Sequence, residues 1–186
     1  MLRVFTRFYQ LYLAYFSKPA ADRVIYRAIR RHRVRSIMEI GMGTGCRAVR
    51  MIRMAQWLRP AVPVRYVGID QFEARTADDS PGITLKQAHR QLKSTAARVQ
   101  LAPGDPLSAL ERVANSLRDI QLVVISHDQQ GESLEQAWFY LPRTLHPKAV
   151  VFQEVLDEKT ALSSFRRIDC SEIERRSRQF DRRRAA

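Results

Sequence analysis

The sequence has 186 residues, a length that fits one domain with a hydrophobic core of its own. Apolar residues make up 45% of it and charged residues 27%, which excludes an intrinsically disordered chain. Its two cysteines, Cys46 and Cys170, lie far apart, which excludes a disulfide framework or a cysteine-based metal site and favours a cytoplasmic location. The net charge of +13 suits an anionic partner such as RNA or a membrane surface, but a surface in which arginine replaces lysine would carry the same charge.

The first nineteen residues, "MLRVFTRFYQLYLAYFSKP", are aromatic and apolar but too short and too often interrupted to span a membrane. As a helix they place five apolar side chains on one face: Leu2, Phe5, Tyr9, Tyr12 and Phe16. We expect this face to pack on the domain or on a second subunit, which would form a homodimer. The alternative is a helix that lies in a membrane surface, with Arg3, Arg7 and Lys18 toward the lipid headgroups.

From residue 20 onward, the pattern predicts helices that alternate with strands. The predicted helices cover residues 20–32, 46–58, 84–96, 106–117 and 133–145, the last of them kinked or shortened by Pro142. The predicted strands cover residues 35–40, 64–70, 98–105, 120–128 and 148–155. Residues 71–83 form a loop that carries Asp78 and Asp79, which are expected to be solvated unless the loop covers a ligand. Residues 163–173 can hold one more strand, and Ser171 is a start signal for a basic helix over 171–184.

The predicted strands are nearly continuous apolar runs, which is typical of strands buried on both faces. Alternation of such strands with helices indicates an α/β fold, a doubly wound and mostly parallel sheet with helices on both faces. We expect an N-terminal helical segment over 1–33, the sheet domain over 34–170 and a basic helix or tail over 171–186.

The stretch "SIMEIGMGTGCRAV" ends the first predicted strand with Glu39 and places Gly41, Gly43 and Gly45 in the turn to a helix. In a doubly wound sheet, ligands bind beyond the carboxyl ends of the strands, and glycines let a ligand approach the backbone closely. The G-x-G-x-G spacing, with no lysine after it, fits neither a dinucleotide fingerprint nor a P-loop. Asp70 ends the next strand, where it can accept hydrogen bonds from ribose hydroxyls, and Asp105 ends the third, where it can accept from an adenine amino group.

These residues resemble the motifs of the class I S-adenosylmethionine-dependent methyltransferases. "MEIGMGTG", "YVGID", "APGDP" and the strand "IQLVVISHD" match the family's first four motifs in order, over about residues 34–155. The resemblance implies a Rossmann-like methyltransferase fold with S-adenosyl-L-methionine as cofactor. The implied cofactor-binding residues are Glu39, Gly41, Met42, Gly43, Thr44, Gly45, Asp70, Gln71, Asp105, Pro106 and Ser126.

Within this resemblance, the three glycines line the methionine half of the cofactor and Glu39 lies beneath the turn, where it holds the backbone amides or reaches the amino group through water. Asp70 takes the ribose, Asp105 the adenine end, and Gln71 and Pro106 flank the ring. The structural alternative is that the glycines only make a tight turn, while Asp70 and Asp105 cap the elements after them.

Methyl transfer does not always require a catalytic residue that a sequence would reveal, because a general base is needed only when the acceptor must lose a proton. His127 and Asp128 are the candidates at a strand end, with His127 as a base or an acceptor-positioning group, or simply as a polar residue at the rim. In the metal-dependent catechol O-methyltransferases, an aspartate and an Asp-Asn pair hold a cation. Here those places hold Ser126 or Asp128 and the pair Gln153–Glu154, so the resemblance implies no metal.

The family usually adds a hairpin of two further strands to the sheet, for which the 31 residues after Val155 leave little room. We therefore expect an abbreviated sheet or one that another subunit completes. The leading hypothesis is a methyltransferase that acts on an unidentified, small-molecule acceptor. The alternative is a catalytically silent relative that binds RNA or an anionic membrane surface. A nicotinamide-dependent oxidoreductase is the third hypothesis, because the third glycine lies one residue too early for the G-x-G-x-x-G pattern of dinucleotide-binding proteins.

Overall fold

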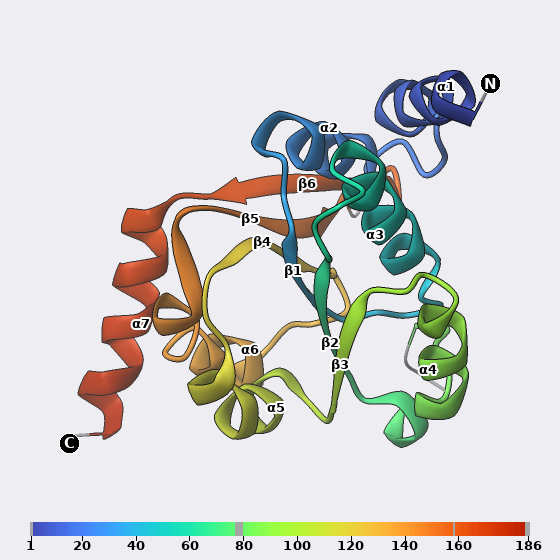
Figure 1. The fold of residues 1–186 in the computed structure, drawn as a ribbon. Coiled ribbons are helices and arrows are strands. Elements are labelled where there is room, and N and C mark those ends of the chain that lie inside the picture. The colour runs from blue at the N-terminus through green and yellow to red at the C-terminus, as the bar shows by residue number, and fades with distance from the viewer. Residues whose placement is uncertain (1, 77–79, 158, 185–186) are drawn as a thin grey trace.

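The centre of the molecule is a six-stranded sheet. The computed structural model describes residues 2–76, 80–157 and 159–184, and within them the strand order is β3-β2-β1-β4-β5-β6 (Figure 1). The strands are β1 (Ser36–Ile40), β2 (Arg65–Asp70), β3 (Arg98–Pro103), β4 (Ile120–Ile125), β5 (Leu145–Leu156) and β6 (Ser163–Ile168). Strands β1 to β5 are parallel, and β6 is antiparallel to β5. The chain winds outward from β1 in both directions, so the strand order reverses between β1 and β4.

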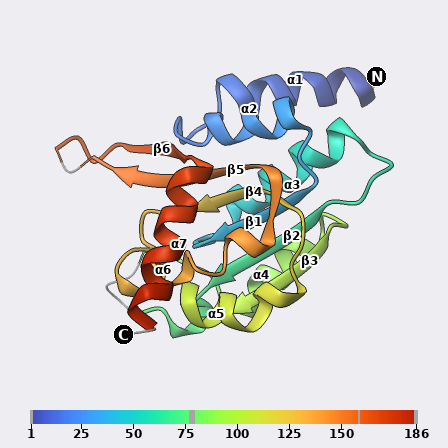
Figure 2. The same ribbon diagram turned by 90° about the vertical axis from the view of Figure 1, so that its left-hand side faces the viewer.

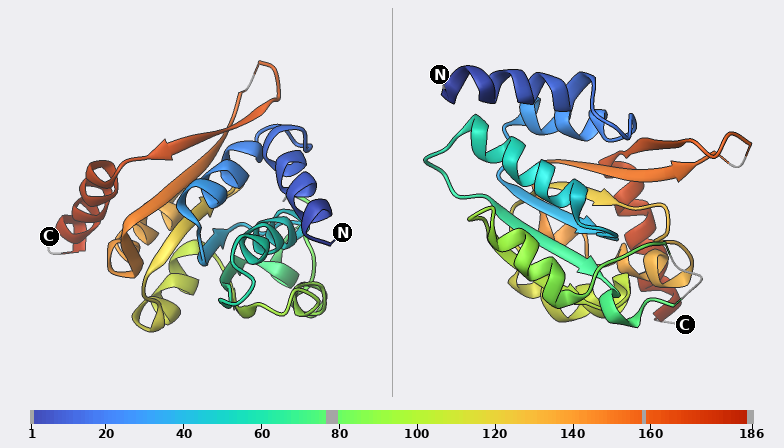
Figure 3. Two further views of the ribbon diagram at one scale, coloured as in Figure 1. Left: turned by 45° about the horizontal axis from the view of Figure 1, so that its top comes forward. Right: turned by 90° about the vertical axis from the view of Figure 1, so that its right-hand side faces the viewer.

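Helices cover both faces of this sheet (Figures 2 and 3). They are α1 (Leu2–Tyr15), α2 (Arg23–His32), α3 (Cys46–Leu58), α4 (Leu85–Lys93), α5 (Pro106–Val113), α6 (Glu132–Ala137) and α7 (Cys170–Arg184). Short 3-10 helices follow β2, α5 and α6: η1 (Phe72–Ala74), η2 (Ala114–Ser116) and η3 (Pro142–Thr144). Apolar side chains of α2, α3 and α4 pack on one face, and those of α5, α6 and α7 pack on the other.

Successive residues of the central strands enter these two cores in turn. In β1, Ile37 packs with the α2–α3–α4 layer, whereas Met38 and Ile40 pack with the α5–α6–α7 layer. In β4, Leu122 and Val123 divide in the same way. Each strand therefore needs apolar residues on both faces, which explains the continuous apolar runs. The predicted doubly wound, mostly parallel α/β fold is confirmed, with one antiparallel strand after β5 in the described part of the chain.

The predicted elements need correction at several boundaries. The helix predicted over 133–145 ends much earlier, because α6 stops at Ala137 and the next residues make tight turns that bury Trp138 and Leu141. The strand predicted from residue 148 begins at Leu145, and the strand predicted to residue 105 ends at Pro103. Helix α7 begins at Cys170, one residue before the predicted start signal. Asp78 and Asp79 lie outside the described residues.

The N-terminal helix buries a different face from the one predicted. Leu13 and Ala14 are fully buried against the domain, whereas Tyr9, Tyr12 and Phe16 are exposed. The side chains of Leu2 and Phe5 lie outside the described ones. Most of the described part of the face predicted from spacing therefore does not pack on the domain, although Tyr9 contacts Trp57 of α3, and its packing on a second subunit or on a membrane surface stays a prediction. The three-part division at residues 33 and 170 stays a prediction, although Leu13 belongs to the same core cluster as the central strands.

Candidate cofactor site

The turn between β1 and α3 lies at the carboxyl edge of the sheet, where the strand order reverses. Its glycines have φ values of +85° at Gly41, +54° at Gly43 and +72° at Gly45, in the region that glycine adopts freely. A Cβ at Gly41 would lie 2.7 Å from Cβ of Ser126 and 2.9 Å from Oδ1 of Asp128. The turn therefore needs glycine at position 41 for two reasons, its backbone conformation and the close approach of the segment after β4.

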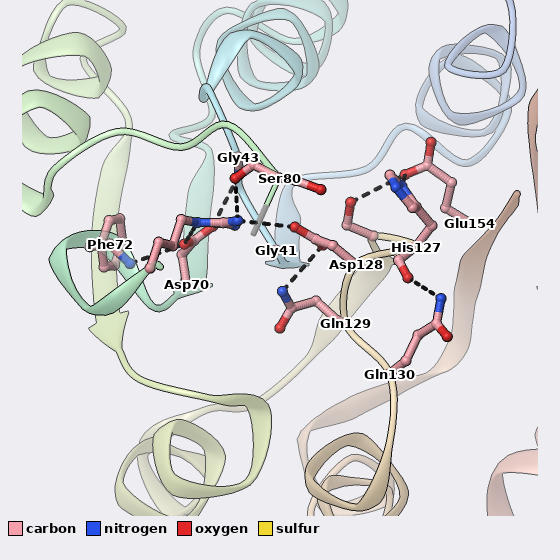
Figure 4. A network of polar contacts seen from close by, with 12 residues as sticks. Gly41, Gly43, Asp70, Phe72, Ser80, His127, Asp128, Gln129, Gln130 and Glu154 are labelled. Carbon is pink, nitrogen blue, oxygen red and sulfur yellow. Dashed lines mark hydrogen bonds and ion pairs between the residues drawn. The ribbon is translucent and has the colours of Figure 1, made fainter. Parts of the chain in front are cut away.

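Asp70, at the end of β2, contacts this turn directly. Its carboxylate accepts hydrogen bonds from the backbone amides of Gly43 and Phe72, each at 3.0 Å (Figure 4). Burial alone would raise the pKa of Asp70, but hydrogen bonds from Arg75 and from these two amides outweigh it and lower that pKa. Asp70 is therefore held ionised against the glycine turn, as a ribose-binding acid would need to be.

Arg75 occupies the outer side of the same carboxylate. Its Nε and Nη2 atoms lie 2.8 Å from Oδ1 and Oδ2 of Asp70, and its Nη1 donates to Asp128 at 3.1 Å and to the carbonyl of Ser80 at 2.8 Å. The guanidinium thus bridges β2 and the segment after β4, and it is almost fully buried. With two amides and two guanidinium donors, Asp70 has used its four acceptor positions. A ribose could reach this carboxylate only by displacing Arg75.

Glu39 lies beneath the turn but does not face it. Its carboxylate is fully buried, 2.7 Å from Nε of Arg47, and accepts a hydrogen bond from the hydroxyl of Tyr66. Burial raises the pKa of Glu39, and the Arg47 charge only partly offsets that effect. The side chain predicted to hold the backbone amides of the turn thus forms an internal ion pair instead.

Arg47 connects Glu39 to two further carboxylates. Its Nη1 lies 3.2 Å from Oε2 of Glu154, on β5, and 3.7 Å from Oδ1 of Asp22. Burial would lower the pKa of Arg47, but the three carboxylates together raise it. Arg47 also packs over the ring of Phe165, 5.5 Å from its centroid. This cluster fixes α3 and the glycine turn to β1 and β5.

Asp105 acts as the N-terminal cap of α5. Its carboxylate accepts hydrogen bonds from the amides of Leu107 and Ser108 and from the hydroxyls of Ser108 and Ser133. Burial acts to raise the pKa of Asp105, but these bonds lower it to about 2. Pro106 occupies the first turn of α5 and is buried. Asp105 therefore caps the helix that follows it, which is the structural alternative that the sequence analysis left open for this residue.

Ser126, His127 and Asp128 follow β4 beside the turn (Figure 4). The hydroxyl of Ser126 donates to Oε2 of Glu154 at 3.2 Å, and Nδ1 of His127 lies 3.6 Å from the same oxygen. Burial would raise the pKa of Glu154, but Arg47 lowers it, so this carboxylate is ionised next to the imidazole. The side chain of His127 is 34% exposed, which leaves it accessible from the edge of the sheet.

The remaining predicted residues lie around the same edge. Met42 is buried against Gly68, Thr44 is exposed, and Gln71 is half-buried. In the part of the chain that the structure describes, no group of three or more His, Cys, Asp or Glu residues could hold a metal ion. No pattern in the sequence pointed to Arg75 or Arg47, whose contacts with Asp128 and Glu154 join segments far apart in the chain.

Comparison with known proteins identifies the fold. No protein-family model matches the chain, and no curated protein sequence matches it. The sheet and its helices match the O-methyltransferase TomG from Streptomyces achromogenes, crystallised with S-adenosylmethionine, at a TM-score of 0.55 and 17% identity, over 91% of this chain and 69% of that one. An O-methyltransferase from Bacillus cereus in complex with S-adenosylhomocysteine matches at a TM-score of 0.55 and 15% identity, over 97% and 76%.

CalS11, a TDP-rhamnose 3'-O-methyltransferase of calicheamicin biosynthesis, matches at a TM-score of 0.55 and 17% identity, over 95% of this chain and 84% of that one. At such low identity the likeness establishes the fold alone. The chain has the fold of the class I S-adenosylmethionine-dependent methyltransferases.

Proposed function

We propose that the protein is an S-adenosylmethionine-dependent methyltransferase that acts on a small molecule. The observation that carries the proposal is the contact between Asp70 and Gly43, which places an ionised carboxylate against the glycine turn at the switch point of the sheet. Proteins of the same fold, TomG and the Bacillus cereus enzyme, were crystallised with S-adenosylmethionine or S-adenosylhomocysteine. The likeness to O-methyltransferases supports a hydroxylated acceptor.

The residues at this edge of the sheet fit the methionine half and the ribose of the cofactor, but Asp105 does not fit its adenine. The glycine turn and Asp70 fit the methionine half and the ribose, because glycine permits close approach and a carboxylate accepts from two hydroxyls. Arg75 must leave Asp70 for that contact to form. Asp105 does not fit as a ligand for adenine, because its carboxylate already accepts four hydrogen bonds within the protein.

When bound, S-adenosylmethionine supplies an electrophilic methyl group. The chain's own contribution is to orient the acceptor and to take its proton, and His127 is suited to the second task. Nδ1 of the imidazole lies 3.6 Å from Oε2 of the ionised Glu154, beyond hydrogen-bond distance, but the negative charge favours a proton on that nitrogen and leaves Nε2 to accept one from the acceptor hydroxyl. Glu154 thus acts as a positioning residue for His127.

Calorimetry with S-adenosylhomocysteine tests the cofactor part of this proposal. Wild-type protein should bind one equivalent, and Asp70→Asn should bind about 10- to 100-fold more weakly because it loses charge-assisted bonds to the ribose. Asp119→Asn, in an exposed loop, is the matched control and should bind as wild type does. Absence of binding at millimolar ligand would contradict the proposal.

The role of His127 is tested separately. His127→Gln should leave the affinity for S-adenosylhomocysteine unchanged and lower turnover of a hydroxylated acceptor by about 100-fold or more. Nitrogen-detected NMR of the wild type should place the imidazole proton on Nδ1, and Glu154→Gln should disturb that tautomer. A proton on Nε2 in the wild type would exclude the proposed arrangement.

A further inference from the structure

Helix α1 presents an apolar face to solvent. We define the aromatic face of α1 as Phe8, Leu11, Tyr12, Tyr15 and Phe16, which recur at the three- and four-residue spacing of one helix side. Phe8 is 67% exposed and Phe16 is 69% exposed. Apolar side chains of this size that lie together on a surface mark an interaction site more often than scattered ones do.

This face lies on a helix that is firmly attached to the domain. Leu13 and Ala14, on the opposite side, are fully buried, and Tyr9 packs edge-on against Trp57 of α3 with 5.1 Å between the ring centroids. After α1, Arg50 donates to the carbonyl of Lys18 at 2.7 Å, and Arg23 donates to the carbonyl of Ser17 at 2.9 Å. The aromatic face is therefore held in place without a partner, and not exposed by fraying.

The net charge of the protein is concentrated in its first 69 residues, which include α1. Residues 1–69 contain fourteen Lys and Arg but only two acids, a net charge of +12 out of the +13 of the whole chain. Both acids, Asp22 and Glu39, are buried beside Arg47. Helix α2, which contacts α1, exposes Arg27, Arg30 and Arg31. The helix that lies beside α1 (Figure 2) thus exposes three cations.

We propose that the aromatic face of α1 binds an anionic lipid surface. A helix of this kind lies in the interface, with aromatic side chains at the boundary between headgroups and acyl chains and cations beside acidic headgroups. Between Phe8 and Ser17 there is no charged residue, so the face can enter the apolar boundary without burying a charge. Among the described residues, no helix is long and apolar enough to cross a membrane, which fits a surface contact.

Two other occupants fit the same observations less well. A symmetric dimer through α1 would bring two regions of charge +12 together, and like charges repel across such an interface. Single-stranded nucleic acid is bound by aromatic side chains interleaved with cations, so that bases stack while phosphates are neutralised. In this protein Arg7 precedes Phe8 on α1, but no cation lies between Phe8 and Ser17, and the exposed arginines of α2 lie on a separate helix, so the aromatic run is not interleaved with cations.

Vesicle sedimentation with the full-length protein tests the proposal. Wild type should sediment with vesicles of phosphatidylcholine that contain about one third phosphatidylserine, and less so as salt rises. Phe8→Ser with Phe16→Ser should lower the partition coefficient roughly tenfold or more. Arg27→Gln with Arg31→Gln should lower it by about fivefold for each charge removed.

Matched controls separate these effects from general loss of apolar surface or charge. Leu162→Ser removes an apolar side chain that is 69% exposed in the turn between β5 and β6. Arg167→Gln with Arg178→Gln removes two exposed cations from β6 and α7. Both controls should sediment as wild type does, and circular dichroism melting should show that every variant folds.

Three results would overturn the proposal. The first is no sedimentation of wild type with anionic vesicles at low salt, and the second is sedimentation that Phe8→Ser with Phe16→Ser leaves unchanged. The third is that this double variant abolishes a dimer seen by light scattering, or retention of RNA, while vesicle binding stays intact. None of these measurements depends on the cofactor, so they test membrane binding independently of the proposed function.

Discussion

Replacing Arg75 by methionine should strengthen the binding of S-adenosylhomocysteine. The guanidinium of Arg75 donates twice to Asp70 and once each to Asp128 and the carbonyl of Ser80. The ribose hydroxyls need the acceptor positions of Asp70 that Arg75 holds, so binding must first break these contacts. Methionine keeps the apolar stem, which packs next to Gly82, and removes only the charged group.

The expected gain follows from the contacts that the ribose must replace. A hydrogen bond to a charged group contributes about 1.5–3 kcal/mol, but desolvation offsets much of the value of a buried ion pair. We therefore expect the cost of releasing Arg75 to be about 1–3 kcal/mol, which corresponds to a Kd roughly 5- to 150-fold lower in Arg75→Met. The variant should also be less stable without ligand by about 2–4 kcal/mol, because Asp70 and Asp128 lose their cation.

Isothermal titration calorimetry measures the affinity, and urea unfolding measures the stability. Arg118→Met, which removes an exposed guanidinium that contacts the carbonyl of Arg143, is the control and should change neither quantity by more than a few tenths of a kcal/mol. A Kd that rises or stays constant in Arg75→Met would contradict competition between Arg75 and the ribose for Asp70. It would mean that Arg75 remains on Asp70 in the complex or contacts the ligand itself.

Three further predictions concern the charges around the turn. Arg47→Met should destabilise the protein by about 3–5 kcal/mol in urea, because it leaves its carboxylates without a cation, whereas Arg53→Met on the exposed side of α3 should cost less than about 0.5 kcal/mol. The pKa of Asp70 in the folded protein lies below its value of about 3.9 in the unfolded chain. Ionised Asp70 therefore contributes its full stabilisation above a pH of about 3.9 and loses it as the pH falls through the folded-state pKa. Asp70→Asn should remove this part of the pH dependence of the free energy of unfolding. Asp105→Ala should cost about 1 kcal/mol by loss of the cap of α5 and leave the affinity for S-adenosylhomocysteine within about twofold, and a large loss of affinity would show that Asp105 holds the ligand.

Much of the architecture was predictable because two local patterns carry it. Strands that are almost continuously apolar, such as "QLVVI", are typical of strands buried on both faces. Their alternation with helices indicates a doubly wound sheet. The glycine turn was predictable because three glycines at alternate positions after a strand favour positive φ angles, and all three adopt them. The cap at Asp105 also has a local signal, Asp before Pro at a helix start, which favours the structural interpretation of that residue.

The contacts that fill the site could not be predicted in the same way. Arg75 lies in a loop with no periodic pattern, and its second partner, Asp128, is 53 residues away. Arg47 joins carboxylates from three separate segments, and only the folded sheet brings them together. The side of α1 that packs on the domain was not predicted, because the aromatic residues give the stronger spacing signal, whereas Leu13 and Ala14 are the residues buried there.

A crystal structure of the protein with S-adenosylhomocysteine would show directly whether Asp70 binds the ribose. The ribose hydroxyls should donate to the carboxylate of Asp70 beside Gly43, with the guanidinium of Arg75 turned away from it. A nucleoside bound at another place, or an Asp70–Arg75 pair that stays intact beside the bound ligand, would contradict it.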